Sequence, residues 1–345
     1  MKKSAFIVAI IVFFLTGCNN PFNSSSTPTP VPISSILLGT GKSVQPTPTP
    51  FQPIPPTPTK TVIILPTSTP VPTIQVTQFP TPDLSNITQP SGQINILILG
   101  SDYRPGQGFR TDVIMLLSLN ASKGTATLTS FPRDLYVTIP GIGMERINTA
   151  QEYGGFALTT ATFQNNFGVT PNYYMMTNFA GFKGIVDTLG GIDVTVASTL
   201  KDTCSVRSMV DGMGYCTIPA GFFHMDGETA LWYVRSRHSS NDFDRTRRAQ
   251  EVITAIFRKL VSLNGLNRTS ELYSQFNSSI ETNIPLSEIV SLLPLASKLA
   301  SDPSSIRRYA IGTNEVYNYI VPGSGAMVLV PDPYAVSAII QQALN

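Results

Sequence analysis

Charged side chains at the ends of apolar segments are the residues of this sequence most able to do chemistry. Only 13% of the 345 residues are charged, yet four clusters interrupt or follow apolar segments. Aspartate carboxylates bind a hard cation such as Mg²⁺, and arginines bind phosphate oxygens in forked pairs. Together the clusters predict a site for a divalent cation and a polyphosphate; they are Gly100-Ser101-Asp102, Arg110-Thr111-Asp112, Ser130-Phe131-Pro132-Arg133-Asp134 and Arg235-Ser236-Arg237-His238.

The segments between these clusters must position them. Each cluster taken alone would ordinarily be a surface salt bridge or a polar loop, and only their combination argues for a site. Short apolar runs at 94–100, 112–119 and 126–131 predict buried strands. Because ligands of open α/β sheets bind at strand ends, the first and third clusters are well placed.

The remaining pattern alternates strands with helices. Strands are predicted at 173–176, 192–196 and 327–330, and helices at 156–167, 179–189, 226–234, 244–263, 285–300 and 333–344. This order predicts an α/β domain with layers around a central sheet.

Residues 19–90 have a different composition. They hold 17 of the 28 prolines, 14 threonines and only three charged residues. Such a stretch buries too little apolar surface to offset its ordering entropy, so we expect a disordered, extended Pro/Thr-rich linker. Residues 91–345 then form one domain with 19 basic and 20 acidic residues. Their net charge of −1 argues against nucleic-acid binding.

The first 18 residues predict export. Lys2 and Lys3 precede an apolar run at 5–15, which is shorter than the roughly 20 residues that span a bilayer. This is typical of a secretory signal peptide. Its end, Leu15-Thr16-Gly17-Cys18, resembles a bacterial lipobox and implies a lipid on Cys18. The alternative is a plain signal peptide with a chance cysteine.

The two other cysteines are Cys204 and Cys216. In an exported protein such a pair is typical of a disulfide, and the intervening Asp211-Gly212 and Gly214 allow the chain to turn back. The alternative is two separate thiols. A metal site is poorly supported, because no histidine pair lies nearby.

A set of motifs between about residues 93 and 260 resembles the LytR-CpsA-Psr cell-wall proteins. The motifs occur in order with ordinary spacing; they are NILILGSDYR at 95–104, RTD at 110–112, SFPRD at 130–134, IPG at 139–141, RINTA at 146–150, VDTLGGIDV at 186–194, DGETALWYVRSR at 226–237 and DFDR at 242–245.

The resemblance implies a fold and a reaction. The fold would be a three-layer αβα sandwich around a mixed central sheet, with an apolar lipid-binding groove. The enzyme would be a Mg²⁺-dependent phosphotransferase of cell-wall biogenesis. It would move a glycopolymer from a polyprenyl-pyrophosphate carrier to peptidoglycan through a phosphodiester. It would work at the outer face of the cytoplasmic membrane, held there by the lipid on Cys18.

The resemblance also implies roles for individual residues. Asp102 and Asp112 would hold Mg²⁺ and, with Arg133 and Asp244, form the catalytic set. Asp244 or Asp242 would orient or deprotonate the acceptor hydroxyl, unless it is only a helix N-cap. The pyrophosphate would be bound by Arg110, Arg133, Arg235, Arg237, Arg248 and Gln250.

One position departs from the family pattern. The family usually has two glutamines after the last arginine, and here the first is Ala249. This departure favours one alternative, a non-catalytic binder of polyprenyl-pyrophosphate glycans. A separate alternative is a pyrophosphate hydrolase, in which the same arginines would serve and water would be the acceptor. A transcription regulator is disfavoured by the export signal and the net charge.

Overall fold

The computed structural model describes residues 84, 87–104, 106–204, 206–237, 242–262 and 269–345. The predicted signal peptide, Cys18 and nearly all of the predicted linker lie outside the described residues, as does His238. Within the described part of the chain, no helix has the length and apolar character needed to cross a membrane.

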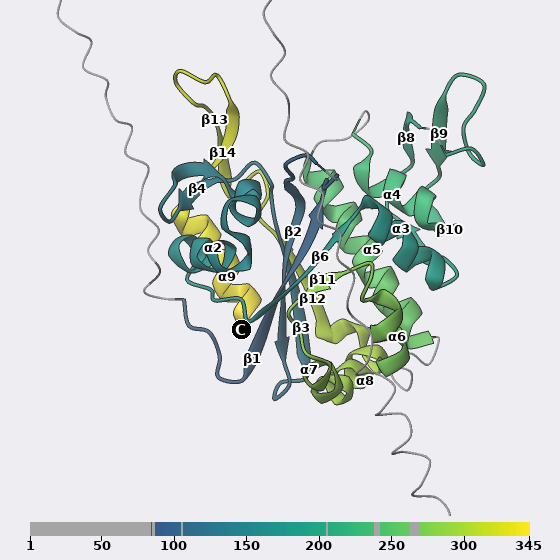
Figure 1. Cartoon of the computed structure of the whole chain (residues 1–345), viewed down its shortest axis with the longest axis horizontal. Helices are drawn as coiled ribbons and strands as arrows, with labels where there is room; N and C mark the ends of the chain where they lie inside the picture. The colour runs from purple at the N-terminus through teal and green to yellow at the C-terminus, as the bar shows by residue number, and fades with distance from the viewer. Residues whose placement is uncertain (1–83, 85–86, 105, 205, 238–241, 263–268) are drawn as a thin grey trace, which may run out of the picture. The chain divides into compact units, whose positions relative to one another are not determined.

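A six-stranded mixed sheet forms the centre of the domain (Figure 1). The sheet order is β11 (Glu281–Thr282), β6 (Tyr173–Asn178), β1 (Gln93–Ser101), β2 (Thr111–Asn120), β3 (Thr125–Phe131) and β12 (Ile306–Ala310). The strand β1 is antiparallel to β2 and parallel to β6, while β3 is antiparallel to β2 and parallel to β12.

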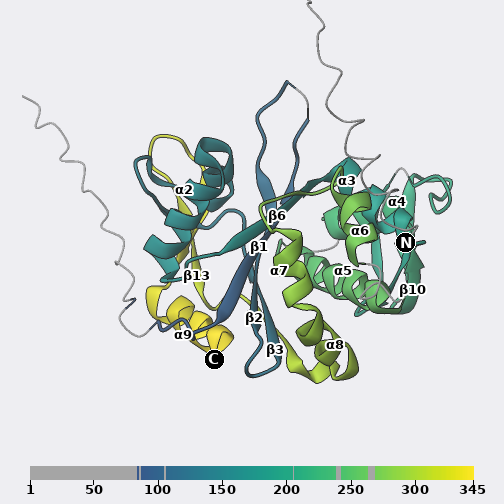
Figure 2. The ribbon, with the colours of Figure 1, turned by 60° about the horizontal axis from the view of Figure 1, so that its bottom comes forward.

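Successive strand residues point to opposite faces of the sheet. Apolar residues lie on both faces, and helices cover each of them. Leu97 and Leu99 of β1 pack in a core with α2 (Ala150–Phe167) and α9 (Pro333–Leu344). Ile96 and Ile98 belong to the opposite face, covered by α5 (Asp242–Ser262), α7 (Leu286–Ser291) and α8 (Leu293–Ser301). The predicted three-layer αβα sandwich is therefore confirmed (Figures 1 and 2).

A smaller unit packs on the outer side of α5. Its core joins β7 (Ile192–Val196), β10 (Gly221–Met225) and α4 (Gly227–Arg235) to Val252 and Ala255 of α5. Beside it lies a hairpin of β8 (Leu200–Thr203) and β9 (Tyr215–Ile218). A disulfide joins Cys204 to Cys216 across this hairpin, with their Cα atoms 5.6 Å apart. The helix α3 (Phe179–Thr188) connects this unit to β6.

Two sets of elements differ from the prediction. The single helix expected at 285–300 is wrong, because α7 and α8 are separate helices that meet at Leu292. Pro294 explains the break, since it has no N–H to donate back to the preceding turn. Several short elements had not been predicted: β4 (Tyr136–Ile139), β5 (Gly143–Arg146), β8, β9, β10, β11, β12, β13 (Val316–Ile320) and α6 (Thr269–Phe276).

Candidate active site

A cavity of about 380 Å³ opens at the edge of the sheet where β1 ends and β2 begins. The end of β6 and the start of α3 form one side of it, and α4 and α5 form the other. The charged residues that line it come from four separate segments of the chain; they are Asp102, Arg104, Arg110, Asp112, Arg133, Arg235, Arg237 and Arg245.

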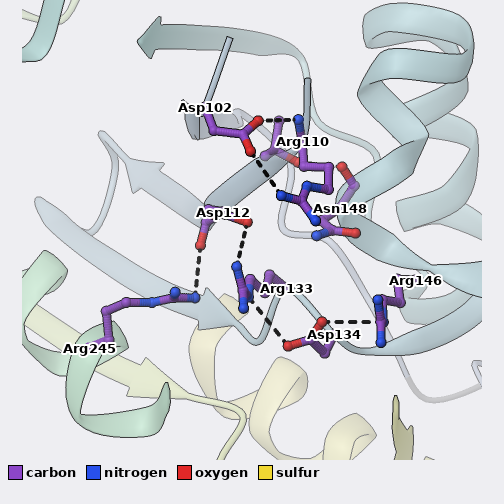
Figure 3. Close-up of polar contacts among 9 residues, drawn as sticks. Asp102, Arg110, Asp112, Arg133, Asp134, Arg146, Asn148 and Arg245 are labelled. Atoms are coloured by element: carbon purple, nitrogen blue, oxygen red, sulfur yellow. Dashed lines mark hydrogen bonds and ion pairs between the residues drawn. The ribbon is translucent and has the colours of Figure 1, made fainter. Parts of the chain in front are cut away.

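Asp102 and Arg110 are joined across the loop between β1 and β2. The Arg110 backbone N–H donates to Asp102 Oδ1 at 2.6 Å, and its Nη2 donates to Oδ2 at 3.1 Å (Figure 3). Burial acts to raise the pKa of the Asp102 carboxyl, but these hydrogen bonds and the Arg110 charge outweigh it. They hold that pKa below its usual value of 3.8, so Asp102 is ionised at neutral pH.

Arg133 lies at the centre of a second polar network. Its Nη1 donates to Asp112 Oδ1 at 2.9 Å, and its Nε contacts Asp134 Oδ2 at 3.3 Å. Asp134 also pairs with Arg146 at 3.3 Å, and Arg245 of α5 donates to the Asp112 backbone carbonyl at 3.4 Å (Figure 3). These contacts hold the Arg133 guanidinium at the mouth of the cavity.

The helix α4 delivers two further arginines. Its N-terminus is capped by Asp226, whose carboxylate accepts from the Thr229 N–H at 2.8 Å. At its C-terminal end the Arg235 guanidinium lies 4.3 Å from the centre of the Phe179 ring. Ser236 leaves the helical conformation with ψ 137°, so Arg237 follows in an extended segment beside the same cavity.

A buried carboxylate supports that segment. Asp202 of β8 is 5% exposed and accepts hydrogen bonds from the Arg237 backbone N–H at 2.6 Å and from the Ser236 hydroxyl. Arg248 donates to the Ser236 carbonyl from the other side. The backbone that carries Arg237 is thereby fixed by the β8–β9 hairpin and by α5.

The interior of the cavity is apolar. Beyond the charged mouth it is lined by side chains of β1, β2, α3 and α5, namely Ile98, Val113, Phe182, Val252 and Ile253, together with Ala249. A second cavity of about 300 Å³ with an apolar lining lies farther along α5, between the same face of the sheet and α6 to α8. The site can therefore hold an anionic head group at its mouth and a hydrocarbon chain inside.

Comparison with known proteins decides the family. The LytR_cpsA_psr family model matches residues 71–338. The chain belongs to this family.

Two characterised relatives of this LytR_cpsA_psr chain illustrate the similarity. It is 32% identical over 212 residues to the polyisoprenyl-teichoic acid–peptidoglycan teichoic acid transferase TagT of Bacillus subtilis, covering 60% of this chain and 65% of TagT. It is 30% identical over 219 residues to the regulatory protein MsrR of Staphylococcus aureus, covering 63% of this chain and 62% of MsrR. In both cases the match spans less than two thirds of the relative.

Solved structures agree with the fold. B. subtilis TagV superposes with a TM-score of 0.61 at 25% identity, over 73% of this chain and 97% of TagV. A TagT structure with bound octaprenyl pyrophosphate lipid superposes with a TM-score of 0.53 at 27% identity, over 73% of this chain and 90% of TagT.

Six of the predicted site residues line one cavity in this LytR_cpsA_psr domain: Asp102, Arg110, Asp112, Arg133, Arg235 and Arg237. Three others do not line it. Gln250 is buried and donates to Ser130 Oγ and to the Tyr309 carbonyl, each at 2.7 Å. Arg248 is buried against Tyr233 and the Ser236 carbonyl. Asp244 lies 3.8 Å from Arg247, with a side chain 42% exposed.

Two arginines of the mouth had no predicted role, Arg104 and Arg245. Arg104 belongs to the first motif, but nothing in its spacing marks it. Arg245 could have been found, because Arg245, Ala249 and Val252 are spaced by four and three residues and share one face of α5. All three line the cavity.

The protein itself offers only part of a magnesium site, namely the carboxylates of Asp102 and Asp112. Among the described residues, no group of three or more His, Cys, Asp or Glu side chains is arranged to hold a metal. Mg²⁺ is, however, usually bound through one or two carboxylates together with substrate phosphates. Asp102 and Asp112 line the same mouth as the arginines, which is the donor set such a site requires.

Proposed function

We propose that the chain transfers a glycopolymer from a polyprenyl-pyrophosphate carrier to peptidoglycan through a phosphodiester bond. The observation that carries this proposal is the joining of an arginine-lined mouth to an apolar interior in one cavity. A polyprenyl pyrophosphate has the same division, with two phosphates at one end and hydrocarbon at the other. The names of TagT and of TagU from Oceanobacillus iheyensis, both teichoic acid transferases, support the assignment.

The chemical step is a displacement at phosphorus. A sugar hydroxyl of the acceptor attacks the phosphorus that carries the glycan, and a new P–O bond forms. The bond from that phosphorus to the bridging oxygen breaks, and polyprenyl phosphate leaves with the bonding electrons. The hydroxyl proton leaves as the new P–O bond forms and passes to water or to a nearby carboxylate.

Fixed cations are the main contribution of this site. Negative charge grows on the bridging oxygen as its bond to phosphorus breaks. Arg133 and Arg235 are held in place by Asp112 and by the Phe179 ring, so they stabilise this charge without first reorganising. When bound at Asp102 and Asp112, Mg²⁺ would neutralise further phosphate charge.

The proposed reaction requires the enzyme to lie at the membrane, where its lipid-linked substrate is held. We propose that Cys18 carries a lipid and that residues 19–90 act as an extended spacer. The domain would then face the outer surface of the cytoplasmic membrane, where the lipid carrier and peptidoglycan meet.

A transfer assay tests the proposal. The full chain in detergent is incubated with a synthetic polyprenyl-pyrophosphate glycan, a peptidoglycan oligomer and Mg²⁺, and products are analysed by mass spectrometry. We expect a phosphate-linked conjugate, reduced by about 10²–10³-fold in Arg133→Ala and in Arg235→Ala. The matched control is Arg308→Ala, because Arg308 is exposed on β12, outside the cavity.

The Mg²⁺ assignment has its own measurement. Calorimetry of pyrophosphate binding, with and without Mg²⁺, should show a Mg²⁺-dependent gain in affinity in the wild type that Asp112→Asn removes. An equal gain in both proteins would contradict the assignment. Activity that persists in both arginine variants would contradict the transferase proposal itself.

Ala249 favours one competing function, that of a binder without turnover. Ala249 lines the cavity at the position where the family pattern has a glutamine, so one amide donor is missing. Bound donor with no conjugate and no released glycan phosphate would support this reading. Released glycan phosphate without conjugate would instead indicate hydrolysis.

A further inference from the structure

A further hollow, a cleft of about 880 Å³, opens beside the 380 Å³ cavity of the candidate active site. It shares Ser101, Thr177 and Asn178 with that cavity, so the two are continuous at the ends of β1 and β6. Its lining residues come from the loop between β1 and β2, the N-terminal part of α2, the ends of β1 and β6, the start of α3 and residues 277–281. None of the predicted site residues lines it.

The lining of this cleft does not suit phosphate. Among its described lining residues there is no lysine or arginine, and the one ionisable carboxylate is Glu281. Two aromatic rings lie on its loop wall instead. Tyr103 is 45% exposed, and its ring centre is 6.0 Å from that of Phe109 in an edge-on arrangement. Aromatic faces beside amides and hydroxyls are the surface that an uncharged sugar requires.

Two side-chain amides of the cleft, those of Asn178 and Gln151, have N–H groups that can donate to a ligand. Asn178 uses its Oδ1 to accept from the Gly181 N–H at 2.9 Å, and Gln151 uses its Oε1 to accept from Thr159 at 2.7 Å. Within the described part of the chain, no hydrogen bond is made by Asn178 Nδ2 or by Gln151 Nε2. Both residues line the cleft, so both can donate to sugar hydroxyls or acetamido carbonyls.

The helix wall contains a pair of glycines. Gly154 and Gly155 interrupt α2, and Gly155 has φ 60° and ψ −157°, a conformation open essentially to glycine alone. A Cβ at Gly155 would meet nothing within 4 Å, so the chain here borders open space. Glu152, one turn earlier, accepts from the Phe109 N–H at 3.2 Å and ties the aromatic loop to this helix.

We infer that this cleft binds the acceptor, as an uncharged glycan strand, next to the bound pyrophosphate. The inference rests on the proposed function, which requires an acceptor hydroxyl beside the phosphorus. The adjoining cavity of the candidate active site, by contrast, is lined by six arginines and two aspartates, and this excess of positive charge suits the anionic donor. The cation-free cleft suits the neutral partner.

The test measures the two ligands separately on the full chain in detergent. The acceptor probe is chitotetraose, a neutral β-1,4-linked N-acetylglucosamine tetramer, and the donor probe is geranylgeranyl pyrophosphate. We expect Tyr103→Ala and Phe109→Ala each to weaken chitotetraose binding by about tenfold, from loss of one aromatic contact. Neither should change geranylgeranyl pyrophosphate binding, which also shows that the variants are folded.

Matched controls are available on the same molecule. Tyr334 and Phe222 are exposed aromatic residues outside the cleft, so Tyr334→Ala and Phe222→Ala should leave both affinities unchanged. Absent chitotetraose binding in the wild type, or equal weakening by the controls, would overturn the inference. So would an effect of the cleft variants only on a donor that carries its sugar. If chitotetraose binds as expected while transfer fails, the proposed function falls and the saccharide site stands.

Discussion

Each aspartate at the mouth of the cavity is paired with an arginine. Asp102 binds Arg110 and Asp112 binds Arg133, so the positive charges are held in place before any phosphate arrives. Both pairs are partly exposed to solvent, and surface pairs contribute little to folding, usually about 0–1 kcal/mol. Their use is to keep long side chains in one position, which lowers the cost of binding an anion.

The Asp102 pair makes folding stability depend on acid pH. The pKa of Asp102 is below 3.8 in the folded chain, so its stabilising effect is present above that value and is lost as pH falls through the folded pKa. We expect Asp102→Asn to lower the free energy of unfolding by about 0.5 kcal/mol or less at neutral pH, after solvent screening. In urea titrations the difference from wild type should disappear well below pH 3.8. A difference that grows on acidification would contradict this sign.

A glutamine at position 249, as in the family pattern, should strengthen binding of the polyprenyl-pyrophosphate substrate. Ala249 lines the cavity and packs near Met115 and Leu128 on the sheet. Ala249→Gln would add two N–H donors, and a hydrogen bond to a charged group contributes roughly 1.5–3 kcal/mol. We expect the Kd for geranylgeranyl pyrophosphate to fall by about tenfold in calorimetry. Ala249→Leu fills the same space without donors, so an equal gain in that variant would refute the amide explanation.

The sequence predicted the aspartates and arginines of the mouth better than the α5 residues. Motif matching marks Gln250 as a candidate but does not say which way a helical side chain points. Neighbouring helical positions are about 100° apart, so Ala249 reaches the cavity while Gln250 bonds to β3 and β12. Helical spacing from Arg245 would have given the correct face.

Among the elements, the β8–β9 hairpin has the least expected connection to the site. Its buried Asp202 accepts from the Ser236 hydroxyl and the Arg237 N–H, directly after the helix that supplies Arg235. The Cys204–Cys216 disulfide closes the hairpin immediately after β8. The β8–β9 hairpin, which belongs to none of the charged clusters, therefore fixes the backbone of an arginine that lines the cavity.

Asp202→Asn should displace Arg237, and so weaken pyrophosphate binding, while the domain remains folded. Asparagine keeps one acceptor oxygen but replaces the other by an N–H₂ group that faces existing donors, which costs about 1–3 kcal/mol of stability. We expect geranylgeranyl pyrophosphate affinity to fall by about tenfold, with chitotetraose binding unchanged. The control is Asp211→Asn, since Asp211 binds the Met213 and Tyr215 N–H groups at the hairpin tip, away from Arg237. Equal losses of pyrophosphate affinity in both variants would show a general effect of the hairpin instead.

Long periodic elements were predictable and short ones were not. The runs at 94–100, 112–119 and 126–131 are β1, β2 and β3, because strands buried on both faces give continuous apolar segments. The edge strand β12 has only intermediate or exposed residues and pairs with β3 across a long separation in sequence. Its pattern is too weak to mark a strand. The same holds for β4 and β5, which have only four residues each.

At the scale of the whole molecule, the two faces of the sheet have different tasks. The face under α2 and α9 is a closed core with Phe131, Phe163 and Phe167 in mutual contact. The face under α5 to α8 contains both cavities with apolar interiors. Under the proposed function, a lipid substrate entering this second face would come from a membrane, so the proposed attachment of the chain to that membrane would bring the cavity to its substrate.

The proposed attachment to the membrane depends on Cys18. Cys18→Ser should remove the diacylglycerol expected on the mature N-terminus, and with it the two acyl chains that give stable anchoring. We expect the wild type to fractionate with membranes and its N-terminal peptide to carry the lipid mass, while the variant is released. Transfer to peptidoglycan in membrane vesicles should then fall by at least about tenfold, because anchoring raises the local concentration of enzyme at its donor. Activity on a detergent-dispersed donor should not change, since the cavity is untouched.

The same fractionation applied to Cys204→Ser is the control, because that change affects the disulfide and not the leader. A wild-type N-terminal peptide without lipid would rule out the anchor at Cys18, whatever the location of the protein.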